Sequence, residues 1–207
     1  MSVAVAAQIA PRVIIPGFFI SQRAFTASNY GEIMQIIAFT FFFVTSVVTF
    51  FQGEIQWLGI IPGIAAIAYW YMQHDPKNTE FYRYADWIIT TPIMLAAILI
   101  TNGAPLSLIV SAIGLDIAMI ASGYKGIVEN DTTWFWYGMI AFIPILYILL
   151  TQKKNKAAIY LTVAVWSLYP IIYYLEESKT FTQEQTTVSF AFMDIVSKVG
   201  LVNLLHI

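Results

Sequence analysis

The chain has 207 residues, of which 59% are hydrophobic and only 11% are charged. Charged residues make up about a quarter of an ordinary soluble domain, so the composition excludes that class and indicates one membrane domain. The net charge of −2 and the lack of a basic run exclude a nucleic-acid partner. The sequence has no cysteine and two distant histidines, so we expect no disulfide and no metal site.

Seven stretches are apolar and close to the roughly 20 residues that a helical membrane span needs. We expect them at about Tyr30–Gln52, Trp57–Gln73, Phe81–Thr101, Pro105–Lys125, Thr133–Thr151, Ala157–Leu175 and Val188–His206. Turn residues fill the short connectors, which implies that neighbouring helices are antiparallel in one bundle. The sequence therefore predicts an all-α membrane protein, a seven-transmembrane-helix bundle that occupies residues 29–207.

Residues 1–28 precede the first span and form a short extra N-terminal segment. Its apolar run Val13–Ile20 is too short to cross a bilayer. It lacks the basic start and the Ala-x-Ala site of a secretory signal. We expect this segment to lie at the membrane interface, with a poorly ordered tail as the alternative.

The orientation in the membrane depends on the loop charges. Lys153, Lys154 and Lys156 lie in one loop, whereas the loops on the opposite side combine their lysines with many carboxylates. Each side has three loop lysines, so their number does not decide the orientation. We expect the 153–156 loop to be cytoplasmic because the carboxylates make the opposite side less positive. Seven spans place the termini on opposite sides, which makes the N-terminus extracellular.

Four charges within the spans are expected to form one neutral cluster. Lys198 and Asp194 are four residues apart, which places them one turn apart on the same helical face. Arg83 and Asp86 lie on the third span, and the Thr90 hydroxyl can reach the Asp86 carboxylate from the next turn. Charges at this depth are costly, rare and usually functional.

Lys198 has a specific chemical use in such a place. A lysine desolvated in an apolar pocket can condense with an aldehyde to form a Schiff base, and Asp194 is a ready counter-ion. A purely structural ion-pair network is the alternative. Asp116, the remaining charge within the spans, has no obvious charged partner in the sequence.

Several motifs resemble signatures of the microbial (type 1) rhodopsins, most readily the bacteriorhodopsin-like proton pumps. They are Arg83–Pro92 (RYADWIITTP), Trp166–Pro170 (WSLYP) and Asp194–Gly200 (DIVSKVG), with weaker likeness over Leu115–Gly123 and Pro62–Tyr69. The resemblance runs from about residue 30 to the C-terminus. The compact chain and its extra N-terminal segment also resemble viral rhodopsins. The resemblance implies a retinal-binding photoreceptor and not an enzyme.

This resemblance also assigns roles to individual residues. It implies that Lys198 carries all-trans retinal as a protonated Schiff base, with Asp86 and Asp194 as counter-ions. Asp86 becomes the proton acceptor, and Arg83 lies on the extracellular side of both aspartates. Two tyrosines are implied to hydrogen-bond Asp194, namely Tyr69 and Tyr169. The implied walls of the retinal site are Trp87, Thr91, Met94, Met119, Gly123, Trp166, Tyr169, Pro170 and Tyr173.

Three aromatic residues of the fifth span have no assigned place. Trp134, Trp136 and Tyr137 either contact retinal or pack against lipid and neighbouring helices, because the motifs do not fix the register of this span.

The cytoplasmic proton donor of the efficient outward pumps is missing from the expected position. That carboxylic acid aligns with Ala97, which cannot carry a proton. Glu54 is the carboxylate expected on the cytoplasmic side, and we expect it to be too superficial to replace the donor. We therefore expect a slow photocycle, slower at high pH. Glu176 and Glu177 lie where proton release is expected, and two solvated acids at a helix end are the alternative.

The leading functional prediction is a light-driven outward proton pump, weak or slow. A light-gated cation channel is the first alternative, but the second span contains no carboxylate to line a polar path. A photosensor is the other, and it needs a separate membrane partner because Lys198 is close to the end of the chain and no output domain is fused. The expected partners are the lipid bilayer, protons and further copies of the chain in a homo-oligomer.

Overall fold

The computed structural model describes residues 30–206, except for the side chains of residues 54, 55 and 206. The N-terminal segment predicted at residues 1–28 lies outside the described residues. The described chain forms two short 3-10 helices and seven α-helices. The α-helices are α1 Tyr30–Phe50, α2 Ile60–His74, α3 Thr79–Thr101, α4 Leu106–Glu129, α5 Thr133–Thr151, α6 Lys156–Glu177 and α7 Gln183–His206.

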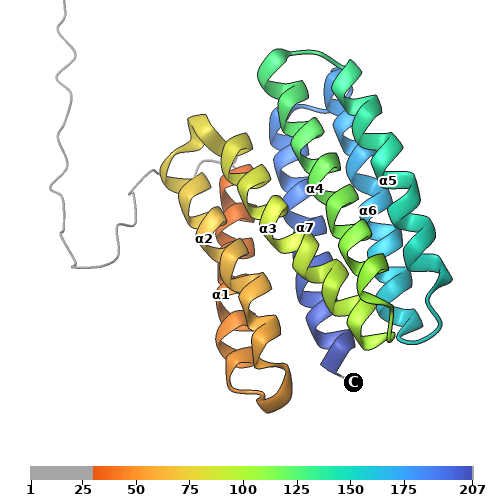
Figure 1. Cartoon of the computed structure of the whole chain (residues 1–207). Helices are drawn as coiled ribbons and strands as arrows, with labels where there is room; N and C mark the ends of the chain where they lie inside the picture. Colours follow the sequence, from red (N-terminus) through yellow and green to blue (C-terminus); the bar gives the residue numbers. More distant parts are fainter. Residues whose placement is uncertain (1–29, 207) are drawn as a thin grey trace, which may run out of the picture.

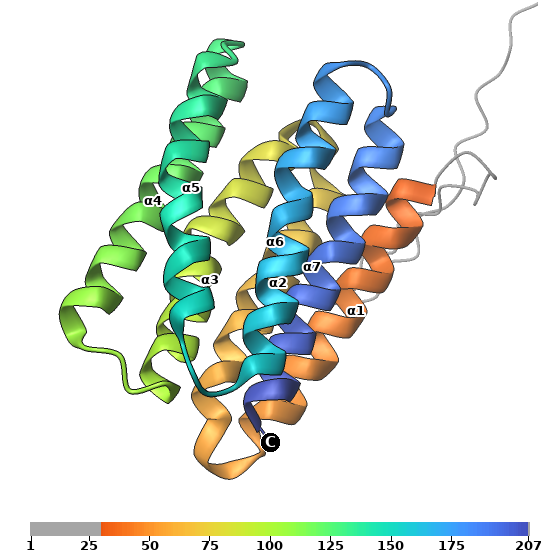
Figure 2. The same cartoon turned by 90° about the vertical axis from the view of Figure 1, so that its right-hand side faces the viewer.

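The helices stand side by side as one antiparallel bundle, as Figures 1 and 2 show from two directions. Each helix packs against the next one in the chain, and α7 returns to pack against α1, which closes a ring. The last helix also contacts α2 and α3. Side chains of α2, α3, α6 and α7 can therefore meet inside the bundle.

Six of the described α-helices have the length and hydropathy of a membrane span. The exception is α2, which has 15 residues and begins at Ile60 instead of Trp57. A seven-residue 3-10 helix, Gly53–Gly59, directly precedes α2 and contains the first three residues of the predicted span. Together these elements fill the place of the second span, and the predicted seven-helix all-α membrane bundle is confirmed.

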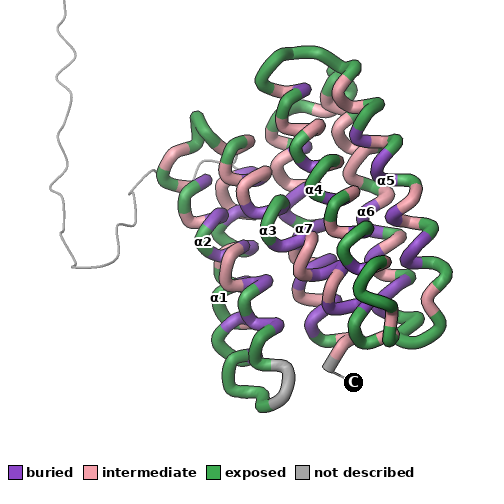
Figure 3. Tube along the Cα trace, viewed as in Figure 1, coloured by how far each residue is buried: buried purple, intermediate pink, exposed green. Residues whose placement is uncertain are grey.

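Exposed apolar side chains cover the outside of the bundle. Figure 3 shows exposed positions on the outward faces of the helices and buried positions between them. Phe41, Val110, Ile140 and Tyr147 are between 52% and 70% exposed. Such a surface is incompatible with water and suits lipid chains, so the protein is an integral multi-pass membrane protein.

The turn between α2 and α3 is stabilised by one carboxylate. Asp75 accepts hydrogen bonds from Asn78 Nδ2 at 2.8 Å and Tyr82 Oη at 2.9 Å. The hydrogen bond from Asn78 has the larger effect and that from Tyr82 the next. Both favour the ionised carboxylate and therefore lower the pKa of Asp75. The carboxylate therefore stays charged at neutral pH and fixes where α3 begins.

The end of the bundle that carries the 153–156 loop is filled by apolar side chains. Lys154 N donates to Asn102 Oδ1 at 2.7 Å there, which joins this loop to the end of α3. We call the buried apolar residues beneath this loop the apolar end cluster. It contains Leu58, Ile61, Ala97, Ile98, Leu99, Ile109, Leu149, Ile159, Leu201 and Val202.

Candidate functional site

Lys198 and two aspartates form a buried ion-pair cluster inside the bundle. Lys198 Nζ lies 2.6 Å from Asp86 Oδ2 and 3.3 Å from Asp194 Oδ1. All three side chains are at most 2% exposed. Asp194 shares a face of α7 with Lys198, and Asp86 reaches them from α3. Two carboxylates around one ammonium offset the large cost of removing these charges from water.

Asp194 is held by three hydrogen-bond donors from three other helices. Tyr69 Oη of α2 donates to Oδ2 at 2.9 Å, and Tyr169 Oη of α6 donates to Oδ1 at 2.6 Å. Trp87 Nε1 of α3 donates to Oδ1 at 3.1 Å. The two tyrosine contacts follow the sequence prediction. The Trp87 contact was not expected, because Trp87 was assigned only as a wall of the retinal site.

Asp86 has fewer partners than Asp194. Besides Lys198, the Thr90 hydroxyl lies 3.2 Å from Asp86 Oδ1 and 2.9 Å from the Asp86 backbone oxygen. A single hydroxyl proton is shared between these two acceptors. The spacing of four residues between Asp86 and Thr90 therefore brings them together as predicted, but the hydrogen bond to the carboxylate is weak.

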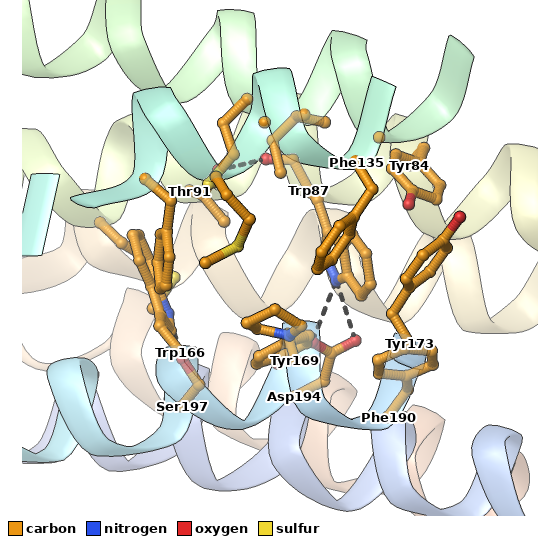
Figure 4. A pocket seen from close by; sticks show the side chains of 18 of the residues that line it. Tyr84, Trp87, Thr91, Phe135, Trp166, Tyr169, Tyr173, Phe190, Asp194 and Ser197 are labelled. Atoms are coloured by element: carbon orange, nitrogen blue, oxygen red, sulfur yellow. Dashed lines mark hydrogen bonds between the residues drawn. The ribbon is translucent and has the colours of Figure 1, made fainter. Parts of the chain in front are cut away.

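A cavity of about 130 Å³ opens beside Lys198. Figure 4 shows Trp166 and Ser197 toward one end, Trp87 and Asp194 in the middle, and Tyr173 toward the other end. All nine residues predicted as walls line this cavity. They are Trp87, Thr91, Met94, Met119, Gly123, Trp166, Tyr169, Pro170 and Tyr173.

A glycine and a serine fix the positions of two aromatic rings in the cavity wall. A Cβ at Gly123 would lie 3.0 Å from the Tyr84 ring, so glycine lets that ring pack closely. At the other end, Trp166 Nε1 donates to Ser197 Oγ at 3.0 Å. Tyr84, Phe190 and Ser197 line the cavity without having been predicted. Ser197 directly precedes Lys198, which is the signal that could have identified it.

The fifth helix contributes a different set of residues from the three considered in the sequence. Its lining residues are Phe135, Gly138, Met139 and Phe142. Their spacing is that of one helical face, and this period was the available signal. Trp136 and Tyr137 are 64% and 53% exposed and do not line the cavity.

Trp134 also lies outside the cavity. Lys125 Nζ lies 4.0 Å from the centre of the Trp134 ring, and Trp134 Nε1 donates a hydrogen bond to Glu129 at 2.8 Å. The packing alternative is therefore correct for all three aromatic residues. The aromatic residues at 134, 136 and 137 lie on faces of α5 that point away from the cavity.

Arg83 does not join the central cluster directly, which corrects the prediction of four charges in contact. Its guanidinium pairs with Glu80, one turn earlier on α3, and lies 4.7 Å from the centre of the Phe190 ring. Among the described ion pairs, none joins Arg83 to Asp86 or Asp194. The spacing of three residues on a helix favours the pair. That spacing is also the sequence signal by which Glu80 could have been found.

Asp116 is fully buried beside the cavity and has one hydrogen-bond partner. Thr91 Oγ1 lies 2.6 Å from its Oδ2, while its Oδ1 has no partner. The same hydroxyl lies 2.8 Å from the backbone oxygen of Trp87. The absence of a charged neighbour agrees with the sequence, and Thr91 links α3 to α4 at this point.

Replacing Thr91 by Val is expected to destabilise the retinal-free protein by about 1 to 3 kcal/mol, because it leaves the Asp116 carboxyl group without a donor. Thermal unfolding in detergent measures the effect. Thr162→Val is the matched control, since the buried Thr162 hydroxyl donates only to the backbone oxygen of Ala158. Equal losses in both variants would show that the bond to Asp116 adds no stability.

The two glutamates predicted for proton release lie at the opposite end of the bundle from the apolar end cluster. Glu176 and Glu177 line a second cavity of about 210 Å³, together with Glu80 and Asp131. The cavity lies at the ends of α3, α4, α6 and α7. Four acidic residues therefore line one cavity on the side where Arg83 meets Glu80.

A ring of seven membrane helices around a buried lysine, two carboxylates and an aromatic cavity defines a retinal-binding rhodopsin. Residues 24–207 match the sequence model of the family described as Bacteriorhodopsin-like protein. The chain belongs to this family. Members of this family bind retinal through a Schiff base to a lysine, and Lys198 is that lysine.

Individual relatives agree with this assignment. Archaerhodopsin-2 of Halobacterium sp. (strain aus-2) is 29% identical over 68% of this chain and 66% of its own length. Sensory rhodopsin III of Haloarcula marismortui is 30% identical over 63% of this chain and 64% of its own length. These matches thus span slightly less than two thirds of the relatives.

A solved structure shows the same fold. The crystal structure of cyanorhodopsin from Tolypothrix sp. NIES-4075 superposes with a TM-score of 0.79 at 23% identity. The match covers 87% of this chain and 95% of that one.

Proposed function

We propose that this rhodopsin is a light-driven outward proton pump with a slow return to its dark state. The observation that supports this most is the 2.6 Å contact between Lys198 Nζ and Asp86 Oδ2. Retinal held on Lys198 would supply a light-driven isomerisation at Nζ. Asp86 is an acceptor already within hydrogen-bond distance of Nζ.

The unequal surroundings of the two aspartates select the acceptor. Asp194 receives bonds from Tyr69, Tyr169 and Trp87, which stabilise its charge. Asp86 has only the shared Thr90 hydroxyl besides Lys198. Because Asp194 is the better stabilised anion, the proton from Lys198 Nζ passes to Asp86.

The path for a replacement proton is the slow part of the proposed cycle. Ala97 is fully buried in the apolar end cluster, and the buried acids among the described residues are Asp86, Asp116 and Asp194. The side chain of Glu54 lies outside the described residues. A proton that enters from the 153–156 side must therefore cross an apolar layer through transient water, which makes recovery slow and slower at high pH.

The apolar end cluster also bears on the alternatives. A photosensor is the second candidate, because a blocked return path prolongs the illuminated state, and it needs a separate partner. A cation channel needs a continuous polar path, which the cluster opposes.

We also propose that the 153–156 loop is cytoplasmic, that the N-terminus is extracellular and that the protein assembles as a homo-oligomer. Glu176 and Glu177 remain the proposed release groups.

Liposomes that contain the retinal-bound protein are expected to show a light-driven pH change that a protonophore abolishes. Photocurrent should keep its sign when the proton gradient is reversed, because transport is coupled to light and not to the gradient. Lys198→Ala, which cannot hold retinal, is the control and should show neither signal. A current that reverses with the gradient would establish a channel, and the absence of both signals would favour the sensor.

A further inference from the structure

Arg83 occupies a position from which it can reach two different carboxylates. Glu80 precedes it by three residues on α3, and Asp86 follows it by three. Residues at this spacing are neighbours on one helical face, so Arg83 lies between them. The structure shows the guanidinium with Glu80 and not with Asp86.

The contacts of Arg83 leave its guanidinium only partly paired. Its side chain is 3% exposed, whereas that of Glu80 is 35% exposed and faces the second cavity. The Arg83 Nε is buried and has no hydrogen-bond partner. The face of Phe190 offers the guanidinium a cation–π contact without fixing its direction. Among the described ion pairs, the partner of Arg83 is therefore Glu80 alone.

We propose that Glu80 is a positioning residue that holds Arg83 away from Asp86 and so sets how readily Asp86 takes up a proton. With Glu80 in place, Lys198 is the cation in contact with Asp86. Without it, the Arg83 guanidinium turns toward Asp86 and Asp194. A second cation there stabilises the Asp86 carboxylate and makes protonation of Asp86 harder.

Several titratable and charged groups surround Arg83 and Asp86 in the structure. Those that face Arg83 or Asp86 are Glu80 and Tyr84 on α3, Tyr69 on α2, Tyr169 and Glu176 on α6, and Asp194 and Lys198 on α7. Glu80 is the member of this set that forms an ion pair with Arg83. Its removal therefore changes the position of Arg83 more directly than removal of any other member.

The test is a titration of the retinal-bound protein in the dark, so it rests on the cofactor and not on transport. Protonation of Asp86 removes a charge beside Lys198 and changes the colour. Glu80→Gln is expected to lower the midpoint pH of this colour change by about one unit or more. Glu80→Asp, with a shorter reach, should give a smaller fall of the same sign.

Glu129→Gln is the matched control, because it removes a glutamate from an exposed pair with Lys125 at the same end of the bundle. It should leave the midpoint unchanged. An unchanged midpoint in Glu80→Gln would overturn the proposal.

A double-mutant cycle separates the position of Arg83 from the direct field of Glu80. In an Arg83→Gln background, Glu80→Gln should no longer move the midpoint, because no guanidinium remains to turn. A shift that persists there would mean that Glu80 acts through its own charge, and would refute the positioning role.

The retinal-free protein provides an independent readout. The side-chain ¹⁵N signal of Arg83 should move in Glu80→Gln and stay in place in Glu129→Gln. An Arg83 signal that is the same in all three proteins would contradict the proposal even if the colour change shifted. Transport can fail in liposomes while both readouts succeed, so this proposal and the proposed pump fail separately.

Discussion

Replacing Asp86 by Asn is expected to abolish light-driven proton transport and to move the absorption maximum to longer wavelength. Asn keeps the shape of the side chain but cannot accept the proton from Lys198 Nζ. A positioned proton-transfer group contributes about a hundredfold or more to the rate of its step, so transport should fall by at least that factor. The colour shifts because one of the two negative charges beside Lys198 is lost.

Asp116→Asn is the matched control for this variant. Asp116 is equally buried and also lies beside the cavity, but its hydrogen bond is to Thr91 and not to Lys198. Its variant should keep most of the transport, measured as the initial rate of light-driven pH change in liposomes. Transport that survives in Asp86→Asn would transfer the acceptor role to Asp194 and refute the assignment.

Much of the site could be predicted because its residues are strongly constrained by the membrane. A charge within a span is costly, so each one stands out in the sequence, and the helical period places Lys198 with Asp194. The structure then adds Asp86 to them at 2.6 Å. The nine predicted wall residues line one cavity because they lie on the inward faces of α3, α4 and α6.

The parts that sequence reasoning missed depend on local competition between partners. Arg83 has acids three residues away in both directions, and only the folded packing decides that it pairs with Glu80. On α5, the aromatic residues are so frequent that composition could not identify the inward face. The lining face uses Gly138 and Met139 among aromatic neighbours. The start of α2 was predicted three residues too early, because the apolar residues just before Ile60 belong to a 3-10 helix.

Replacing Ala97 by Asp is expected to shorten the recovery of the dark state by about tenfold or more, because an acid placed there can donate a proton. Ala97 lies three turns beyond Asp86 on α3, roughly 16 Å along the helix axis. It is fully buried in the apolar end cluster, which otherwise separates Lys198 from the 153–156 side. Flash spectroscopy in detergent measures the recovery rate, which should also become less dependent on pH near neutrality.

Ala97→Asn distinguishes donation from simple hydration. Asn has the same shape as Asp and also places a polar group in the apolar layer, which lowers thermal stability in both variants. It cannot donate a proton as an acid does, so its recovery should stay close to that of the wild type. Equal acceleration by Asn would mean that entry of water limits recovery and that no donor is required. No acceleration by Asp would place the slow step on the Asp86 side of Lys198, where the proton leaves toward Arg83 and Glu80.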